Sequence, residues 1–258
     1  MIRESFIFLD RISDKSEENI WAQGINDWNE FLKQKNVFGI SPARKIFYDQ
    51  KIREAAGALR DYNSLYFKDM PESWRLYEYF RDDVVFLDIE IAKDYSDITV
   101  IGMFDGYETK TMVKGFNLDK ELLRRELLQY KLIITFNGGS FDLPALQKYF
   151  NDILPKIPHI DLRHLCARIG LNGGLKEIEK RIGIKRRDII ERMYGGDPAL
   201  LWRKFLATGD QNFIELLVEY NEEDIINLKP LAEFTIKKLW EIRKKESKPS
   251  FQRLCSSS

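Results

Sequence analysis

The fold of this chain is decided by the stretch VVFLDIEI at residues 84–91. Successive side chains of a β-strand point to opposite faces, so Asp88 and Glu90 would share one face while their apolar neighbours pack on the other. Two like charges in the centre of an apolar strand are costly unless a cation compensates them. The stretch therefore predicts a buried strand that presents two carboxylates to a metal ion, with an ordinary pair of solvated acids as the alternative.

Strand-like and helix-like segments alternate after this stretch. Runs of apolar and β-branched residues predict strands at residues 84–91, 98–104, 107–113, 131–136 and 159–161. Asp105-Gly106 marks a hairpin turn between the second and third strands. Helices are expected at residues 118–129 and 141–150, and mainly helices follow from 162 to about 245. This order predicts an α/β domain over residues 81–246, with a mixed five-stranded sheet flanked by helices.

Residues 1–80 are predicted to form a small, mostly helical region. Its helices would run from a Ser16–Asn19 cap to about Gln23, from Asp27 through Leu32, from Ser41-Pro42 to about Tyr62, and from Pro71-Glu72 to near Phe80. Residues 21–32 faintly resemble a helix-hairpin-helix, which binds the DNA backbone, but their large apolar side chains favour packing into a small core. Residues 247–258 are polar, and we expect a flexible tail.

Two further motifs carry acidic residues. The motif NGGSFD at residues 137–142 follows the fourth predicted strand, so Asp142 would lie near a strand end, where sites gather in open α/β sheets. A helix cap formed by Asp142 or Ser140 is the alternative. Tyr220 and Asp224 lie four residues apart in a helical stretch and would share a face, although such a pair is more often an ordinary surface pair. No histidine stands near this last motif to act as a base.

Taken together, the order and spacing of these motifs resemble the DnaQ-like 3′→5′ exonucleases of the RNase H-like superfamily. The tyrosine of the last motif is typical of the branch called DEDDy. The chain looks most similar to the YprB-like group and to archaeal stand-alone exonucleases akin to the proofreading domain of family B DNA polymerases. Residues 136–144, 159–165, 173–183 and 200–228 carry this resemblance, which covers about residues 82–239. The resemblance implies an RNase H-like fold.

The resemblance also implies a role for each motif residue. Asp88, Glu90 and Asp224 would hold one metal ion. Asp88 would bridge to a second ion, which Asp142 would hold largely through water. Tyr220 would orient the attacking water by a hydrogen bond. Two Mg²⁺ or Mn²⁺ ions suit such an all-oxygen site, and they can activate water and stabilise the leaving 3′-oxygen, releasing a nucleoside 5′-monophosphate.

Residues that contact the substrate are less clearly marked. Asn137 and Phe141 could touch the terminal nucleotide, Phe141 by stacking, although Phe141 suits a core position equally well. Lys176 and Arg186 belong to a basic stretch that could contact phosphates, or could simply be a solvated face. The other members of this stretch are Arg181, Lys185 and Arg187. Asp161 is expected to cap a helix rather than to bind a ligand.

The composition limits the remaining functions. Lysine and arginine (41) balance aspartate and glutamate (41), which argues against a strongly basic DNA-coating protein but not against a nuclease with clustered acids. Two cysteines and two histidines are too few for a zinc site of the usual kind, and they supply a Ser-His-Asp triad poorly. No apolar stretch is long enough to span a bilayer, so we expect a soluble, cytoplasmic protein.

The sequence therefore favours a metal-dependent 3′→5′ exonuclease acting on single-stranded nucleic acid, with DNA favoured over RNA. An exoribonuclease with the same site is one alternative, because contacts to the 2′-hydroxyl cannot be read from these residues. A non-catalytic module that binds nucleic acid or a replication partner is another. At 258 residues the chain is too short to hold a polymerase domain as well, so any role in replication or repair would involve partner proteins.

Overall fold

The computed structural model describes residues 1–92, 97–187 and 197–246. The contacts divide the chain into two units: the sheet unit, Arg81–Thr235, and the helical unit, Met1–Phe80 with the residues from Ile236 onward. The division near residue 80 coincides with the expected boundary, whereas the expected domain at 81–246 continues past Thr235. That residues 81–246 fold as one domain stays a prediction, and the expected tail at 247–258 lies outside the described residues.

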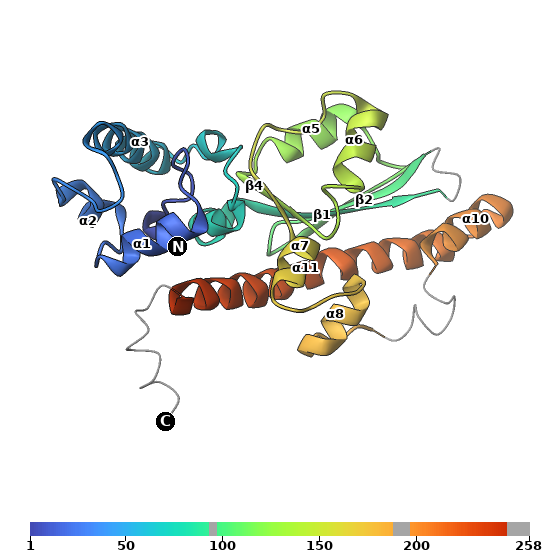
Figure 1. Cartoon of the computed structure of the whole chain (residues 1–258). Helices are drawn as coiled ribbons and strands as arrows, with labels where there is room; N and C mark the ends of the chain where they lie inside the picture. Colours follow the sequence, from blue (N-terminus) through green and yellow to red (C-terminus); the bar gives the residue numbers. More distant parts are fainter. Residues whose placement is uncertain (93–96, 188–196, 247–258) are drawn as a thin grey trace. The chain divides into compact units, whose positions relative to one another are not determined.

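A five-stranded sheet, in the order β3-β2-β1-β4-β5, forms the centre of the sheet unit (Figure 1). Its strands are β1 (Val84–Ile91), β2 (Ile98–Phe104), β3 (Thr109–Val113), β4 (Leu132–Thr135) and β5 (His159–Asp161). The pairs β1–β2 and β2–β3 are antiparallel, and the pairs β1–β4 and β4–β5 are parallel. The predicted mixed five-stranded sheet is confirmed.

The third strand begins at Thr109, two residues later than predicted. The Asp105 carboxylate accepts hydrogen bonds of 2.8 Å from the backbone N–H groups of both Tyr107 and Glu108. These bonds hold the two residues in the turn, so β3 starts only after them. The turn itself lies at Asp105-Gly106 as predicted, and Gly106 adopts a φ of 99° that favours glycine.

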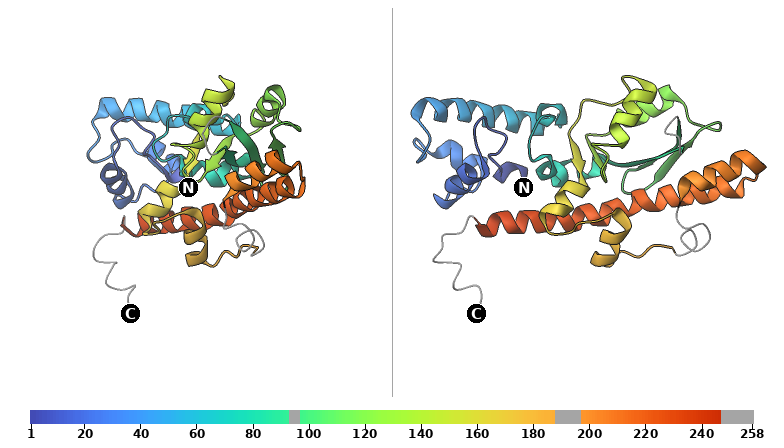
Figure 2. Two further views of the ribbon diagram at one scale, coloured as in Figure 1. Left: turned by 90° about the vertical axis from the view of Figure 1, so that its right-hand side faces the viewer. Right: turned by 45° about the vertical axis from the view of Figure 1, so that its right-hand side comes forward.

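Helices cover both faces of this sheet (Figures 1 and 2). The sheet unit contains α5 (Lys120–Leu127), α6 (Asp142–Phe150), α7 (Leu162–Arg168), α8 (Leu175–Ile182), α10 (Pro198–Thr208) and most of α11 (Asn212–Glu246). On one face, α5 and α6 share a buried core with Leu87 and Ile89 of β1. On the opposite face, α10 and α11 bury Trp202 and Leu217 against Val100 of β2. The result is the predicted α/β fold.

The alternation of β1 turns its acidic residues toward the layer that contains α11. Across the β1–β2 pair, Asp88 lies opposite Gly102 and Glu90 lies opposite Val100. Directly opposed residues share a face of a sheet. Because Val100 packs in the core formed with α10 and α11, Asp88 and Glu90 face the same layer. The two-residue period of one strand thus decides which helix can meet the acids.

The helical unit has its own buried core. Its α-helices within residues 1–80 are α1 (Asp14–Ala22), α2 (Trp28–Lys33), α3 (Pro42–Arg60) and α4 (Tyr77–Phe80). Ile20, Trp21, Trp28 and Phe31 are all buried, so the interpretation of residues 21–32 as a packed core is confirmed.

Two of the four helix starts predicted for this unit are confirmed, whereas the helix predicted from Pro71-Glu72 begins as a 3-10 turn at Ser73–Leu76 and becomes α-helical only at Tyr77. Asp27 and Ser41 cap α2 and α3 through their side chains. However, α1 begins at Asp14 because Ser13, and not Ser16, is its N-cap and accepts the Ser16 N–H. The earlier start places acidic residues in the first turn of α1, where the helix dipole favours negative charge.

The last helix, α11, belongs to both units. It runs from Asn212 to Glu246 with Pro230 inside it, and its residues from Ile236 onward are counted with the helical unit. Neither α11 nor any other helix in the described part of the chain is both long and apolar enough to cross a membrane.

Candidate metal centre and active site

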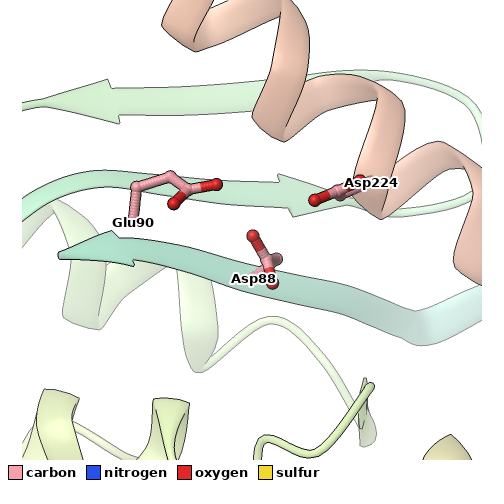
Figure 3. A group of neighbouring side chains, drawn as sticks. All are labelled: Asp88, Glu90 and Asp224. Carbon is pink, nitrogen blue, oxygen red and sulfur yellow. The ribbon is translucent and has the colours of Figure 1, made fainter. Parts of the chain in front are cut away.

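Three carboxylates from β1 and α11 point into the same space (Figure 3). One oxygen atom from each of Asp88, Glu90 and Asp224 lies within 4.8 Å of the other two. Asp88 and Glu90 share a face because they are two residues apart in β1, and α11 brings Asp224 over that face. Oxygen ligands bind Mg²⁺ or Ca²⁺ at roughly 2.0–2.6 Å, so a single ion could reach all three carboxylates.

These carboxylates are poorly solvated and close enough to repel one another. Burial raises the pKa of Asp88 well above its usual value, and the neighbouring carboxylates raise it further. Burial and the charge of Asp224 likewise raise the pKa of Glu90. Burial raises the pKa of Asp224 to about 6, although the Arg186 guanidinium acts in the opposite direction. A divalent cation would relieve this repulsion because it favours the ionised carboxylates.

Asp142, the fourth predicted acid, lies beside this cluster at the first residue of α6. Its Oδ1 accepts the backbone N–H of Ile89 at 3.0 Å, next to the β1 edge that β4 leaves open beyond Phe86. Burial raises the pKa of Asp142 to about 7. Among the neighbouring charges, Asp142 has the largest effect on the pKa of Asp88. The alternative role as a helix cap is wrong, because α6 follows Phe141 without any side-chain cap.

Tyr220 lies one helical turn before Asp224 on α11 and is half-buried. Burial raises the pKa of the Tyr220 hydroxyl well above its usual value, and the charge of Asp224 raises it further. The Lys176 ammonium lies 4.7 Å from the centre of the Tyr220 ring, in cation–π contact. The hydroxyl therefore keeps its proton near neutral pH and can donate a hydrogen bond, but it is a poor base.

Asn221 is a site residue that the sequence did not reveal. Its Nδ2 donates to the Asp88 carboxylate at 2.9 Å and lies 3.4 Å from the Asp88 carbonyl oxygen. Among the described residues, its Oδ1 has no hydrogen-bond partner although it is buried. Gly102 makes room for this amide, since a Cβ atom at Gly102 would overlap the Asn221 side chain. The Asn221 amide therefore fixes the orientation of Asp88, and no residue larger than glycine fits at position 102.

The basic stretch around α8 makes ion pairs within the sheet unit. The Arg186 guanidinium contacts both oxygens of Glu179, and its Nη1 lies 2.5 Å from Oδ1 of Asp224. Arg181 pairs with Glu177 one turn away on α8, where both side chains are exposed. Arg186 therefore lies at the acid cluster, as expected for a site residue. Its predicted contact with phosphate stays a prediction and requires that it leave Asp224.

A loop between β4 and α6 carries the two residues predicted to touch the nucleotide. Asp161 accepts the backbone N–H groups of Asn137 and Gly139 at 2.8 and 3.2 Å, and it also caps α7 as predicted. The Asn137 side chain accepts a hydrogen bond of 2.9 Å from Arg163. Phe141 is 39% exposed, so its interpretation as a core residue is wrong. Asp161 and Arg163 thus shape this loop, a role that their positions in the sequence did not indicate.

The chemistry of the cluster suits a hard divalent cation. Its three candidate ligands are all carboxylate oxygens, which Mg²⁺ and Mn²⁺ prefer over imidazole or thiolate ligands. Two of the three come from one rigid strand, so their spacing is set before any ion binds. Asp88, Glu90 and Asp224 therefore fit a metal ion of this class, while the identity of the ion stays a prediction.

Comparison with known proteins places this geometry in a family. A model of the RNase H superfamily matches residues 85–236, which include Asp88, Glu90, Asp142 and Asp224. Among solved structures, the chain is similar to the family B DNA polymerase from the hyperthermophilic archaeon Pyrobaculum calidifontis, with 14% identity and a TM-score of 0.46. That similarity covers 58% of this chain and 24% of the polymerase chain, so the matched part spans about a quarter of the polymerase's length. No curated protein matched the chain.

Proposed function

Because the chain belongs to the RNase H superfamily, we propose that the acid cluster on β1 and α11 is the active site of a nuclease. The observation that carries the proposal is the meeting of Asp88, Glu90 and Asp224 within 4.8 Å. A module that only bound nucleic acid would gain nothing from clustered carboxylates, because they repel phosphate. Phosphodiester hydrolysis assisted by divalent cations does need them.

The proposed reaction is 3′→5′ exonucleolytic hydrolysis of single-stranded DNA, by the two-metal mechanism of the DEDDy branch. Asp88, Glu90 and Asp224 would hold one Mg²⁺ or Mn²⁺ ion, and Asp142 would help Asp88 to hold the second. When bound, the two ions supply an activated water and charge stabilisation at the leaving 3′-oxygen. Asn221 would keep the Asp88 carboxylate oriented through the 2.9 Å hydrogen bond.

The remaining site residues would position the substrate. Tyr220 would donate a hydrogen bond that orients the attacking water, so Tyr220→Phe should lower the rate only about tenfold to a hundredfold. The exposed Phe141 would stack on the terminal base, with Asn137 beside it. Lys176 and Arg186 would contact phosphate. The products would be nucleoside 5′-monophosphates. The cytoplasmic location and the replication or repair partners stay predictions.

The proposal is tested with a single-stranded DNA oligonucleotide labelled at its 5′ end. Wild-type protein is incubated with Mg²⁺, with Mn²⁺ or with EDTA, next to the variant Asp224→Asn. Glu215→Gln serves as the matched control, because Glu215 is an exposed acid on the same helix. We expect a ladder that shortens from the 3′ end, is lost in EDTA and in Asp224→Asn, and is unchanged in Glu215→Gln.

Other outcomes would redirect the proposal. Cleavage of the matching RNA but not of DNA would favour the exoribonuclease. Full activity of Asp224→Asn would show that the active site lies elsewhere. If the folded wild type cleaved neither nucleic acid with either ion, the nuclease proposal would be wrong. The remaining alternative would be a non-catalytic module that binds nucleic acid or a replication partner.

A further inference from the structure

Arg186 contacts two acids, Glu179 through two nitrogen atoms and Asp224 through one. Its Nε and Nη2 contact the two oxygens of Glu179, the second at 2.9 Å, while Nη1 lies 2.5 Å from Oδ1 of Asp224. Glu179 is 1% exposed and Asp224 is 8% exposed. The two-point contact with Glu179 is the stronger attachment, because a guanidinium and a carboxylate match in shape. Glu179 therefore anchors Arg186, and the remaining nitrogen is directed at Asp224.

A second contact holds the same segment against α11. The backbone N–H of Arg187 donates to the Glu223 carboxylate at 2.5 Å, and Glu223 precedes Asp224 on the helix. The chain reaches this position directly after α8, which is followed by Gly183 as a C-cap in the left-handed conformation. Residues 186 and 187 are thus attached both to α8 and to α11. If Arg186 left Asp224, the bonds to Glu179 and Glu223 would keep it close to the cluster.

Asp224 thus has a cation beside it that the protein itself supplies. The same carboxylate lies within 4.8 Å of Asp88 and Glu90, where a divalent ion would bind. A guanidinium and a divalent ion that share one carboxylate repel each other, and the repulsion is strong where solvent is scarce. The two cations therefore compete for Asp224.

We propose that Arg186, anchored by Glu179, is an internal counter-cation that occupies Asp224 in the metal-free protein and yields it to the metal ion. This role rests on the proposed metal site, and it makes Arg186 and Glu179 positioning residues that act through Asp224. In the absence of metal, Arg186 offsets the repulsion within the cluster and holds Asp224 in place. On metal binding, Arg186 stays on Glu179 and is released from Asp224. The pair would thereby set the metal affinity of the site.

The test measures metal binding rather than cleavage. Mn²⁺ is titrated by calorimetry into the metal-free wild type and into the double variant Arg186→Gln/Glu179→Gln. The double substitution removes both charges and so avoids leaving Glu179 buried without a partner. We expect the double variant to bind Mn²⁺ roughly tenfold more tightly, because the competing cation is gone. The exposed pair Glu177–Arg181 supplies the control, and Arg181→Gln/Glu177→Gln should bind like the wild type.

The outcomes separate this inference from the proposed function. Equal or weaker Mn²⁺ binding by the folded double variant would overturn the counter-cation role while leaving the nuclease proposal intact. A wild type that bound no Mn²⁺ would overturn both. If the double variant did not fold, a crystal structure of the wild type with Mn²⁺ would decide. The Arg186–Asp224 contact should then be broken and the Arg186–Glu179 contact kept, whereas an intact Arg186–Asp224 contact beside a bound ion would contradict the inference.

Discussion

Glu17 of the helical unit and Asp88 of the sheet unit are both carboxylates, the first fully buried and the second partly buried, and their surroundings differ. Glu17 is fully buried and accepts hydrogen bonds from two backbone N–H groups. Nη1 of Arg75 lies 2.7 Å from both of its oxygens, and the Arg75 guanidinium itself lies over the rings of Trp74 and Trp240. In the helical unit, therefore, the fold supplies donors and an opposite charge for the acid that it buries.

The sheet unit treats its acids differently. Asp88 receives a hydrogen bond from Asn221, but its nearest charged neighbours are other carboxylates. Arg186 offsets part of this charge, and it does so at Asp224 rather than at Asp88 or Glu90. A buried acid that is surrounded by its own donors stabilises a fold, whereas buried acids that face one another prepare a place for a cation. Glu17 is thus a buried acid that stabilises the fold, and Asp88 is one that suits a metal site. Substitutions at the two positions can test this difference.

The largest effect should come from Asp88→Asn, which keeps the shape of the side chain and removes one charge of the cluster. We expect nuclease activity to fall by at least about 10³-fold, because a metal ligand shared by both proposed ions is lost. The metal-free variant should also unfold at a higher temperature than the wild type, because repulsion is relieved. Cleavage rates and thermal scans in EDTA measure the two effects. A lower unfolding temperature would contradict the claim that the cluster is strained without metal.

Glu17→Gln should have the opposite consequence for stability. The substitution leaves the Arg75 charge buried without its partner, so the free energy of unfolding of the helical unit should fall by about 3–5 kcal/mol. Urea unfolding followed by tryptophan fluorescence measures this loss. The double variant Glu17→Leu/Arg75→Met removes both charges and should recover most of the stability. If the single variant lost less than about 1 kcal/mol, Glu17 would not be the structural counterpart that the comparison requires.

Gly102→Ala tests the Asn221 amide, a neutral group that donates a hydrogen bond to Asp88. The added Cβ atom would overlap the Asn221 amide, so we expect a loss of about 1–3 kcal/mol and a lower cleavage rate. Gly57→Ala in α3 is the matched control, because the new Cβ atom would meet only the end of the Arg60 side chain at 3.7 Å. That control should be stabilised by about 0.5–1 kcal/mol, since alanine favours helix. Equal thermal stability of the two variants would argue against a tight Asn221 site.

The smallest effect is a pH dependence of the metal-free protein. The pKa values of Asp142 and Asp224 are raised to about 7 and about 6. The folded state therefore binds more protons than the unfolded state, and the stability from these acids falls as pH rises from about 4 to about 7. We expect thermal scans in EDTA to show a melting temperature a few degrees lower at pH 8 than at pH 5.5. Saturating Mn²⁺ should remove this dependence, and an unchanged slope with Mn²⁺ would mean that other groups cause it.

The sheet and the acids Asp88, Glu90 and Asp224 could be predicted from the sequence, because their positions depend on the periodicity of single strands and helices. Alternation along residues 84–91 places Asp88 and Glu90 on one face, and helical spacing pairs Tyr220 with Asp224. The strands at 84–91, 98–104 and 159–161 end at the predicted residues. Helix starts do not follow from local sequence in the same way, since Ser13 and Ser16 are both good N-cap residues and the structure uses Ser13.

The residues that surround the acids could not be predicted in the same way. Asn221 reaches Asp88 only because Gly102, far away in the sequence, leaves space in the neighbouring strand. Arg186 meets Asp224 only because the chain after α8 crosses α11, and the sequence shows it merely as one member of a basic stretch. One residue could have indicated this contact. Glu179 is a charged residue on the apolar side of α8, and a buried acid needs a cationic partner, which here is Arg186.

The shared helix α11 bears on the order in which the chain can fold while it is being made. Trp240, near the end of α11, packs edge-on against Trp21 and Trp74, so the helical unit joins residues that lie on either side of the sheet unit in the sequence. The sheet unit, in contrast, is one continuous stretch, Arg81–Thr235. On the ribosome, residues 1–80 are therefore made well before residues 236–246, with the whole of Arg81–Thr235 made in between. Until residues 236–246 emerge, the nascent chain would expose an unfinished aromatic surface, which is the interval in which chaperones or neighbouring chains can bind it.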